Sequence, residues 1–228
     1  MTTQKNLSRR IGIVGGLGTE TSCTLCLRIN SRIRDASNCQ PNLVMENVPM
    51  PLILEKEIIQ GNPSEQIFSL LSNAVKNLDS TDVIAIPCNS VHIFLSRLRE
   101  ISNKILSIME ETARECKNQG LKKVGLLATR TTIKSQLHES ELKHLGIETI
   151  TPTEKEQDAI NEVILNILEG NRVDESKLNE TILNLKDQGA EAVILGCTDL
   201  QLAVKDSPLP VIDTLKVLED AVVRFLTK

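Results

Sequence analysis

The sequence predicts an α/β protein with two pseudo-symmetric parallel-sheet domains and a cleft between them. Short, wholly apolar segments alternate with longer segments of helical period along the 228 residues, which is typical of parallel strands covered by helices on both faces. The order of segments then repeats. The strand segment at Ile11 recurs at Val124, and the segment ending at Cys88 recurs at Cys197, at nearly the same offset. This repetition favours an internal duplication over generic α/β alternation.

The first half is predicted to alternate four strands with three helices. The helix after Ser64 is the clearest, because its apolar residues recur every three or four positions and Ser64 can cap its N-terminus. In order, we expect a strand at residues 10–16, a helix at 19–34, a strand at 42–48, the helix from Ser64, a strand at 82–87, a helix at 90–101 and a strand at 104–109.

The second half repeats this alternation. Thr153 and Glu156 have the spacing of a capping box, and apolar residues at helical spacing follow them. In order, we expect a strand at residues 123–129, a helix ending near Gly146, a strand at 147–153, the helix from Thr153, a helix ending near Gly189, a strand at 191–196, a helix after Cys197, a strand at 209–213 and a final helix.

The composition excludes several classes of protein. The formal net charge of −4 argues against a nucleic-acid or anionic-membrane partner. With three Phe and no Tyr or Trp, the core must be aliphatic, and no base-stacking platform can be built. We find no signal peptide and no run of membrane-spanning length. The six cysteines are too dispersed for a disulfide framework, so we expect a cytoplasmic protein with reduced thiols.

Two matching segments carry the candidate chemistry, AIPCNSVH around Cys88 and ILGCTDL around Cys197. Each cysteine lies where a strand ends and a helix begins, the position at which open parallel sheets bind ligands. Helix N-terminal amides lower a thiol pKa from about 8.5 towards neutrality. The neighbouring Asn89, Ser90 and Thr198 can hold a carboxylate together with these amides.

If the halves face each other, the two thiols flank one ligand. One thiol would abstract a proton and the other would donate one to the opposite face, which inverts a carbon centre without a cofactor. The alternative for each cysteine is simple burial. Which thiol is deprotonated at rest stays open, because coupled groups titrate as a pair.

Two further motifs indicate no chemistry of their own. The glycines of GIVGGLG lack the spacing of a dinucleotide fingerprint, because Val14 stands where glycine is needed. We expect a tight turn that lets the backbone approach a small ligand. Cys23 and Cys26 form a C-x-x-C within a helical segment, where ordinary packing is favoured over a redox or zinc site.

The three histidines indicate no metal site. His92 lies one turn into the helix after Cys88, where it could orient substrate or satisfy a local hydrogen bond. We expect His138 and His144 on the surface of a helix. The EKEQD segment is expected to be a solvated helix start.

The segments quoted above resemble the aspartate/glutamate racemase family, the PLP-independent amino-acid racemases. PCNSVH is similar to the family's P-C-N-T-A-H segment, and GCTDL to its G-C-T-E segment. GIVGGLGTETS, GLLATRTTI and TPTEKEQ are similar to the glycine-rich opening, the second-half opening and a following segment. The resemblance runs from about Ile11 to the last helix.

The resemblance implies a cofactor-free and metal-free racemase of small amino acids, often a homodimer, with Cys88 and Cys197 as its two acid/base residues. It also implies that the C-terminal helix returns to the first domain. We therefore expect a first domain of residues 1–105 plus 214–228 and a second domain of residues 106–213. The implied substrate-binding residues are Gly16, Asn89, Ser90, Thr129, Arg130, Thr131, Thr132 and Thr198.

One departure concerns the substrate. Aspartate-specific members carry an Arg for the distal carboxylate in a P-D-R-T stretch. Here the stretch reads PMPLILE, with an apolar residue at about Ile53, and a second basic residue after TPTEKEQ is not evident. Because a buried carboxylate without a cation is costly, strict aspartate specificity is disfavoured. Arg130 could supply the charge from another side, or the substrate could be a broader or different set of amino acids.

Two other functions stay open on the sequence alone. A dicysteine isomerase or decarboxylase of small diacids would keep the fold and both cysteines, with one of them acting as nucleophile or proton donor. A two-domain protein that binds a small ligand without catalysis is the other alternative.

Overall fold

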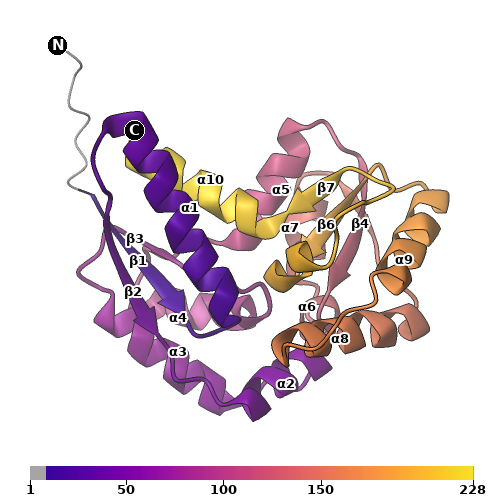
Figure 1. Cartoon of the computed structure of the whole chain (residues 1–228), viewed down its shortest axis with the longest axis horizontal. Coiled ribbons are helices and arrows are strands. Elements are labelled where there is room, and N and C mark those ends of the chain that lie inside the picture. Colours follow the sequence, from indigo (N-terminus) through magenta and orange to yellow (C-terminus); the bar gives the residue numbers. More distant parts are fainter. Residues whose placement is uncertain (1–8, 228) are drawn as a thin grey trace.

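The computed structural model describes residues 9–227, which form two parallel sheets with helices on both faces (Figure 1). The first sheet has the strand order β2-β1-β3 and the second β5-β4-β6-β7, and every pairing is parallel. The strands are β1 Arg10–Gly15, β2 Asn42–Asn47, β3 Val83–Ala85, β4 Lys123–Ala128, β5 Glu148–Ile150, β6 Ala192–Gly196 and β7 Val211–Asp213. Residues 1–8 and 228 lie outside this range. Both belong to the predicted first domain, and residues 1–8 are the segment in which no signal peptide is expected.

The predicted duplication is visible in the strand order, with β1, β2 and β3 equivalent to β4, β5 and β6. The predicted strand at 104–109 is wrong. Ile105 makes only an isolated parallel bridge to Ile84, at the place that β7 takes in the second sheet. The chain turns into a helix instead, because the Ser107 hydroxyl accepts the Glu110 N–H and caps that helix.

The helices largely follow the predicted segments. Thr153 and Glu156 form the predicted capping box. A helix does begin after Ser64, but the Ser64 side chain makes no capping hydrogen bond. The helices are α1 Thr19–Ser37, α2 Leu52–Gln60, α3 Glu65–Asn77, η1 Ser90–Phe94 (a 3₁₀-helix), α4 Leu95–Ile101, α5 Ile108–Asn118, α6 Arg130–Lys134, α7 Leu137–His144, α8 Glu154–Leu168, α9 Ser176–Asp187, η2 Thr198–Leu202 (a 3₁₀-helix) and α10 Thr214–Thr227. The sequence did not predict α2. The helix expected to end near Gly146 is two helices, α6 and α7.

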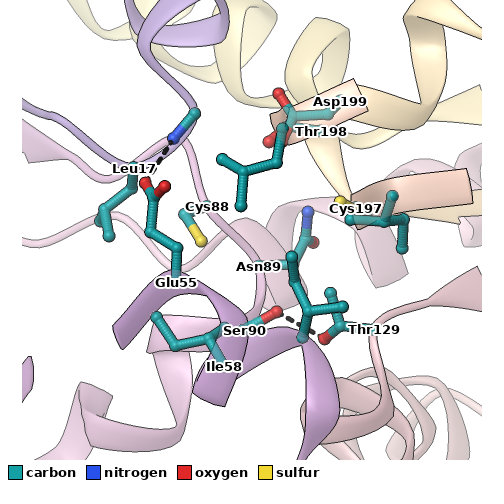
Figure 2. Close-up of a pocket in the computed structure, with 14 residues that line it drawn as sticks. Leu17, Glu55, Ile58, Cys88, Asn89, Ser90, Thr129, Cys197, Thr198 and Asp199 are labelled. Atoms are coloured by element: carbon teal, nitrogen blue, oxygen red, sulfur yellow. Dashed lines mark hydrogen bonds between the residues drawn. The ribbon is translucent and has the colours of Figure 1, made fainter. Parts of the chain in front are cut away.

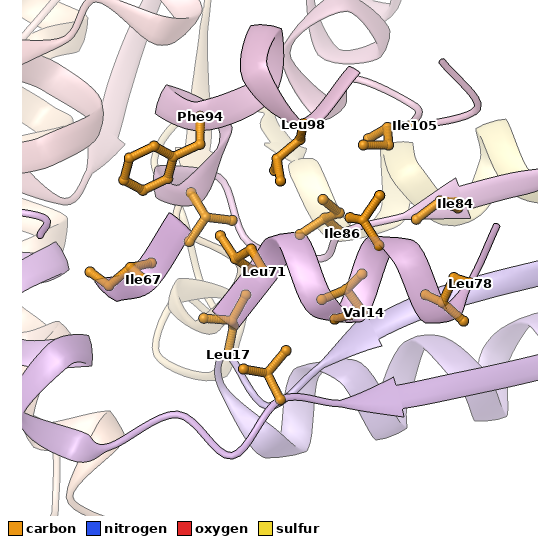
Figure 3. Packing of buried hydrophobic residues seen from close by; sticks show 14 of the residues in the cluster. Val14, Leu17, Ile67, Leu71, Leu78, Ile84, Ile86, Phe94, Leu98 and Ile105 are labelled. Atoms are coloured by element: carbon orange, nitrogen blue, oxygen red, sulfur yellow. The ribbon is translucent and has the colours of Figure 1, made fainter. Parts of the chain in front are cut away.

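Strand β1 is buried on both faces, as the apolar pattern predicts. Val14 packs into the cluster beneath α3, together with Ile67 and Leu71 of that helix (Figure 3). Ile11 and Ile13 point to the opposite face, where they contact a cluster that includes residues of α1 and α10. This two-sided burial keeps the carboxyl end of β1 at a defined place beside the site described below.

The last helix crosses back from the second sheet to the first (Figure 1). Leu218 and Val222 of α10 pack in the cluster that covers β1. Arg32 of α1 forms an ion pair with Glu219 of α10 at 2.7 Å. A discontinuous first domain requires such packing, and the boundaries at residues 105 and 213 stay a prediction. Among residues 9–227, no helix has the length and apolar character needed to cross a membrane.

Candidate active site

A cavity lies between the two halves, at the loops that follow β3 and β6 and carry the two cysteines (Figure 2). It has about 460 Å³ of space free of atoms, part of it open to solvent. The lining residues are Leu17, Gly18, Glu55, Ile58, Ile59, Cys88, Asn89, Ser90, Thr129, Ile164, Leu168, Cys197, Thr198 and Asp199.

Six of the ten predicted site residues line this cavity: Cys88, Asn89, Ser90, Thr129, Cys197 and Thr198. The other four lie behind it or beside it. Gly16 makes a turn at φ +82°, where a Cβ would lie 2.1 Å from the Val48 carbonyl oxygen, so only glycine fits. Thr131 donates to the Ile58 carbonyl, and Thr132 hydrogen-bonds to the Ser90 hydroxyl at 3.1 Å.

Arg130 does not supply the positive charge that the sequence suggested for the substrate. Its guanidinium pairs with Glu154 at 2.6 Å and with Asp158, both on the exposed start of α8. Burying the cation against the cavity would break these pairs. The structure therefore gives the cavity no charge from Arg130.

The Cys88 thiol lies at the start of η1. The backbone N–H groups of Ser90 and Val91 face it and act to lower its pKa. His92, which the sequence left between two roles, makes local hydrogen bonds: its ring Nδ1 lies 2.8 Å from the Cys88 carbonyl oxygen and its Nε2 accepts from Ile108 N–H. His92 does not line the cavity. Its two hydrogen bonds instead hold the loop that carries Cys88.

The Cys197 thiol has an equivalent environment at the start of η2. The N–H groups two and three positions later, of Asp199 and Leu200, face it. The Thr198 hydroxyl donates to the Pro87 carbonyl at 3.1 Å. One cysteine loop therefore holds the backbone immediately before the other cysteine.

The prediction of a lowered thiol pKa is wrong. Desolvation by the surrounding protein raises the pKa of Cys88 to about 12, and the charges of Asp199 and Glu55 add to it. Desolvation also raises the pKa of Cys197, again with a contribution from Asp199. The helix-end amides act in the expected direction but are outweighed. Cys88 further raises the pKa of Cys197, so the two thiols are electrostatically coupled.

A buried hydrogen-bond network joins Asn89 to the other half. Asn89 Nδ2 donates to the Thr214 hydroxyl at 3.0 Å, and Asn89 Oδ1 lies 2.9 Å from His138 Nε2. Because that oxygen can only accept, His138 Nε2 carries the proton. The predicted surface position of His138 is wrong: its side chain is fully buried on the same face of α7 as Leu142. His144 is exposed, as predicted.

Sequence reasoning missed Glu55, Asp199 and the apolar wall of the cavity. Ile53, near which the family's arginine is expected from the sequence, is 63% exposed on α2 and does not line the cavity. The face of α2 turned inward carries Glu55, Ile58 and Ile59. Their helical spacing was the signal that could have found them, had α2 been recognised as a helix.

The two carboxylates are held by neutral donors. Asp199 accepts a hydrogen bond from the Thr21 hydroxyl across the boundary between the halves. Glu55 accepts from Gly18 N–H at 3.4 Å (Figure 2). Desolvation raises the pKa of both carboxyl groups. Within residues 9–227, no three His, Cys, Asp or Glu side chains are grouped to hold a metal ion.

Comparisons with known proteins agree with this geometry. The family model for Asp/Glu/Hydantoin racemase matches residues 14–222. A Yersinia pestis protein described as a candidate Asp/Glu racemase has 26% sequence identity and a TM-score of 0.83, over 96% of this chain and 100% of that one. An aspartate racemase homologue from Pyrococcus horikoshii OT3 has 24% identity and a TM-score of 0.76, over the same shares of the two chains.

A curated relative adds no functional information. An uncharacterized protein from the pnlA 3′ region of Pectobacterium carotovorum subsp. carotovorum is 30% identical over 120 residues, which are 50% of this chain and 80% of that protein. The family match, by contrast, spans most of the chain, and the two sheets agree with the two-domain fold of the structural relatives. The chain therefore belongs to the Asp/Glu/hydantoin racemase family.

Proposed function

We propose that the protein is a cofactor-independent amino-acid racemase in which Cys88 and Cys197 act as opposing acid and base. The observation that carries this proposal is the pairing of two cysteines from equivalent loops on the wall of one cavity. Family membership supports the activity class. The coupling between the two thiols supports a shared role in proton transfer.

In the proposed reaction, the hydroxyls of Ser90 and Thr129 and the amides at the start of η1 and η2, including the Thr198 N–H, bind the α-carboxylate. One cysteine thiolate removes the α-proton, and the electron pair left on the α-carbon is delocalised into the carboxylate. The thiol of the other cysteine then donates its proton to the opposite face. The enantiomer leaves, and the protonation states of the two cysteines are exchanged.

One thiol must be deprotonated before this reaction starts. Both thiols have a raised pKa, and the charge of Asp199 contributes to both shifts. The α-ammonium of the substrate is a cation that would enter beside the thiols, and a nearby cation lowers a thiol pKa. We propose that substrate binding itself favours the reactive thiolate.

The cavity does not favour the diacid alternative. Of the described residues that line it, none is Lys or Arg, and two are acidic, Glu55 and Asp199. A dicarboxylate would place two anions beside these carboxylates without a cationic partner, which is electrostatically costly.

Localisation and oligomeric state are further proposals. All six cysteines are free, which supports a reducing compartment such as the cytoplasm. A homodimer is proposed from the family resemblance, and light scattering coupled to size-exclusion chromatography would measure its mass.

Proton NMR in D₂O tests the racemase proposal. The reduced protein is incubated with a panel of L-amino acids, and each α-proton signal is followed. We expect one class of amino acid to lose its α-proton signal, and Cys88→Ala and Cys197→Ala to abolish that loss. Cys116→Ala is the matched control, because Cys116 is buried in a core cluster away from the cavity. Full turnover in both single variants, or no exchange with any amino acid, would contradict the proposal.

A further inference from the structure

The charges around the cavity are unbalanced. Glu55 enters from α2 in the first half and Asp199 from η2 in the second half, so two separate elements each bring a carboxylate to one cavity. Their hydrogen-bond donors, Gly18 N–H and the Thr21 hydroxyl, are uncharged. The carboxylates are therefore stabilised without being neutralised.

The neighbouring cations are engaged elsewhere. Lys56, beside Glu55 in the chain, pairs with Glu169 at 2.6 Å. Arg130, beside Thr129 in the chain, pairs with Glu154 and Asp158 on the surface. Neither cation lines the cavity, so a ligand must bring any positive charge that balances the two carboxylates.

The two carboxylates occupy different positions relative to the thiols. The charge of Asp199 acts on both thiols, because it contributes to the raised pKa of Cys88 and to that of Cys197. Glu55 contributes to that of Cys88 alone. Figure 2 shows Glu55 on the Leu17 side of Cys88, away from Cys197. The two carboxylates lie on either side of Gly18, whose N–H donates to Glu55 and whose Cβ position is 2.9 Å from Asp199 Oδ1. Asp199 is thus placed for the α-ammonium, and Glu55 for a more distant group.

Part of the cavity wall is apolar. Ile58 and Ile59 of α2 and Ile164 and Leu168 of α8 line it. Such a wall suits a methylene chain, since a long side chain can bury its stem against apolar surface while its charged end meets a carboxylate.

We infer that the substrate is an amino acid with a cationic side chain, of the lysine or ornithine class, whose distal ammonium pairs with Glu55. A neutral zwitterion brings one cation and one anion and leaves the two carboxylates in excess. A second ammonium group reduces that excess, and Glu55 is the carboxylate not needed at the α-centre. This inference rests on the proposed racemase function and names its substrate class.

The test compares α-proton exchange in D₂O for lysine, ornithine, norleucine, glutamate and aspartate. Norleucine matches the chain of lysine without the distal charge. We expect kcat/KM for lysine or ornithine to exceed that for norleucine by about 10- to 100-fold, the value of one charged hydrogen bond. We expect kcat/KM for glutamate and for aspartate to be lower than that for norleucine.

Variants at Glu55 make the test specific. Glu55→Gln should lower the ratio of kcat/KM for lysine to kcat/KM for norleucine by about 10- to 100-fold. The ratio is the readout because losing the Glu55 charge also acts on the Cys88 thiol, and that effect is common to both substrates. Glu55→Asp keeps the charge and should keep the preference for lysine, which also shows that the site tolerates substitution. Glu162→Gln, at an exposed position on α8 paired with Lys177, is the matched control and should behave as the wild type.

The outcomes separate the two proposals. Fast exchange on glutamate, aspartate or norleucine with slow exchange on lysine would overturn the inference and leave the racemase proposal intact. Equal losses for lysine and norleucine in Glu55→Gln would also overturn it, because the role of Glu55 would then not depend on distal charge. No exchange with any of the five amino acids would overturn the inference, and the full panel of L-amino acids would then decide the racemase proposal.

Discussion

The two cysteine loops share a backbone arrangement but differ in what supports them. Each thiol lies in the loop after the third strand of its half and faces the N–H groups two and three positions later. The Cys88 loop is held by imidazole and amide groups, through His92 and through Asn89 with His138. The Cys197 loop is held by the Thr198 hydroxyl and by the Asp199 carboxylate.

This difference indicates which parts of the duplicated unit are constrained. The position of the thiol at the strand end is the same in both halves, as two opposing acid/base groups require. The supporting side chains are free to differ, because each loop only needs partners from the opposite half. Asn89 contacts His138, and Thr198 contacts Pro87. Closing the two halves therefore builds both loops at once.

The largest expected effect tests the equivalence of the two thiols. Cys88→Ala and Cys197→Ala should each lower the racemisation rate by about 10²- to 10⁴-fold, the usual contribution of a general acid or base. The double variant should be only a few-fold worse than either single variant, because the two residues act on one proton path. Chiral chromatography of the product measures all three rates. A single variant that keeps about a tenth of the wild-type rate would show that the thiols are not equivalent.

The second prediction compares how much the hydrogen bonds of each cysteine loop contribute to folding stability. Asn89→Leu leaves His138 Nε2 without a partner and removes the donor to the Thr214 hydroxyl, which keeps its bond to the Leu195 carbonyl. It should cost about 2–4 kcal/mol of folding stability. Thr198→Val leaves only the Pro87 carbonyl without its partner and should cost about 1–2 kcal/mol. Urea unfolding followed by circular dichroism measures both. Equal losses would mean that the two loops are equally well supported.

The histidine support should make stability depend on pH. Burial lowers the pKa of His138 to about 3, and the neighbouring His92 adds to this. An unfolded histidine titrates near 6.5, so below about pH 6.5 the unfolded state binds one more proton than the folded state. The free energy of unfolding should therefore fall towards acid by up to about 1.4 kcal/mol per pH unit from this residue.

The comparison uses His138→Gln, which removes the titrating ring but keeps an N–H donor for Asn89. Its slope of stability against pH should be shallower by about one proton. His144→Gln, at an exposed position, is the control and should keep the wild-type slope. An unchanged slope in His138→Gln would contradict the assignment of a buried neutral imidazole.

The smallest effect distinguishes the carboxylates. Asp199 raises the pKa of both thiols, whereas Glu55 contributes only to that of Cys88. Asp199→Asn should lower both thiol pKa values, and Glu55→Gln only that of Cys88. The measurement is the pH dependence of iodoacetamide labelling at each cysteine, read by peptide mass spectrometry. Labelling of the exposed Cys39 should not change between variants. Equal shifts of both thiols in Glu55→Gln would remove the distinction between the two carboxylates.

The sequence by itself determined the duplicated α/β alternation, the capping box at Thr153 and the two cysteine loops. These features depend on local patterns, namely apolar runs, helical spacing and the residues at strand ends. The family resemblance rests on the same segments, and the family match over residues 14–222 confirms it. The roles of Cys88 and Cys197 stay predictions until the variants are measured.

Only the tertiary structure decided what faces the cavity. It turned Glu55 inward and left Ile53 exposed, buried His138 against Asn89, and paired Arg130 with the surface of α8. The physical reason is the same in each case. The face of a short helix that becomes buried depends on which distant element packs against it, and the thiol pKa depends on how much water that packing removes.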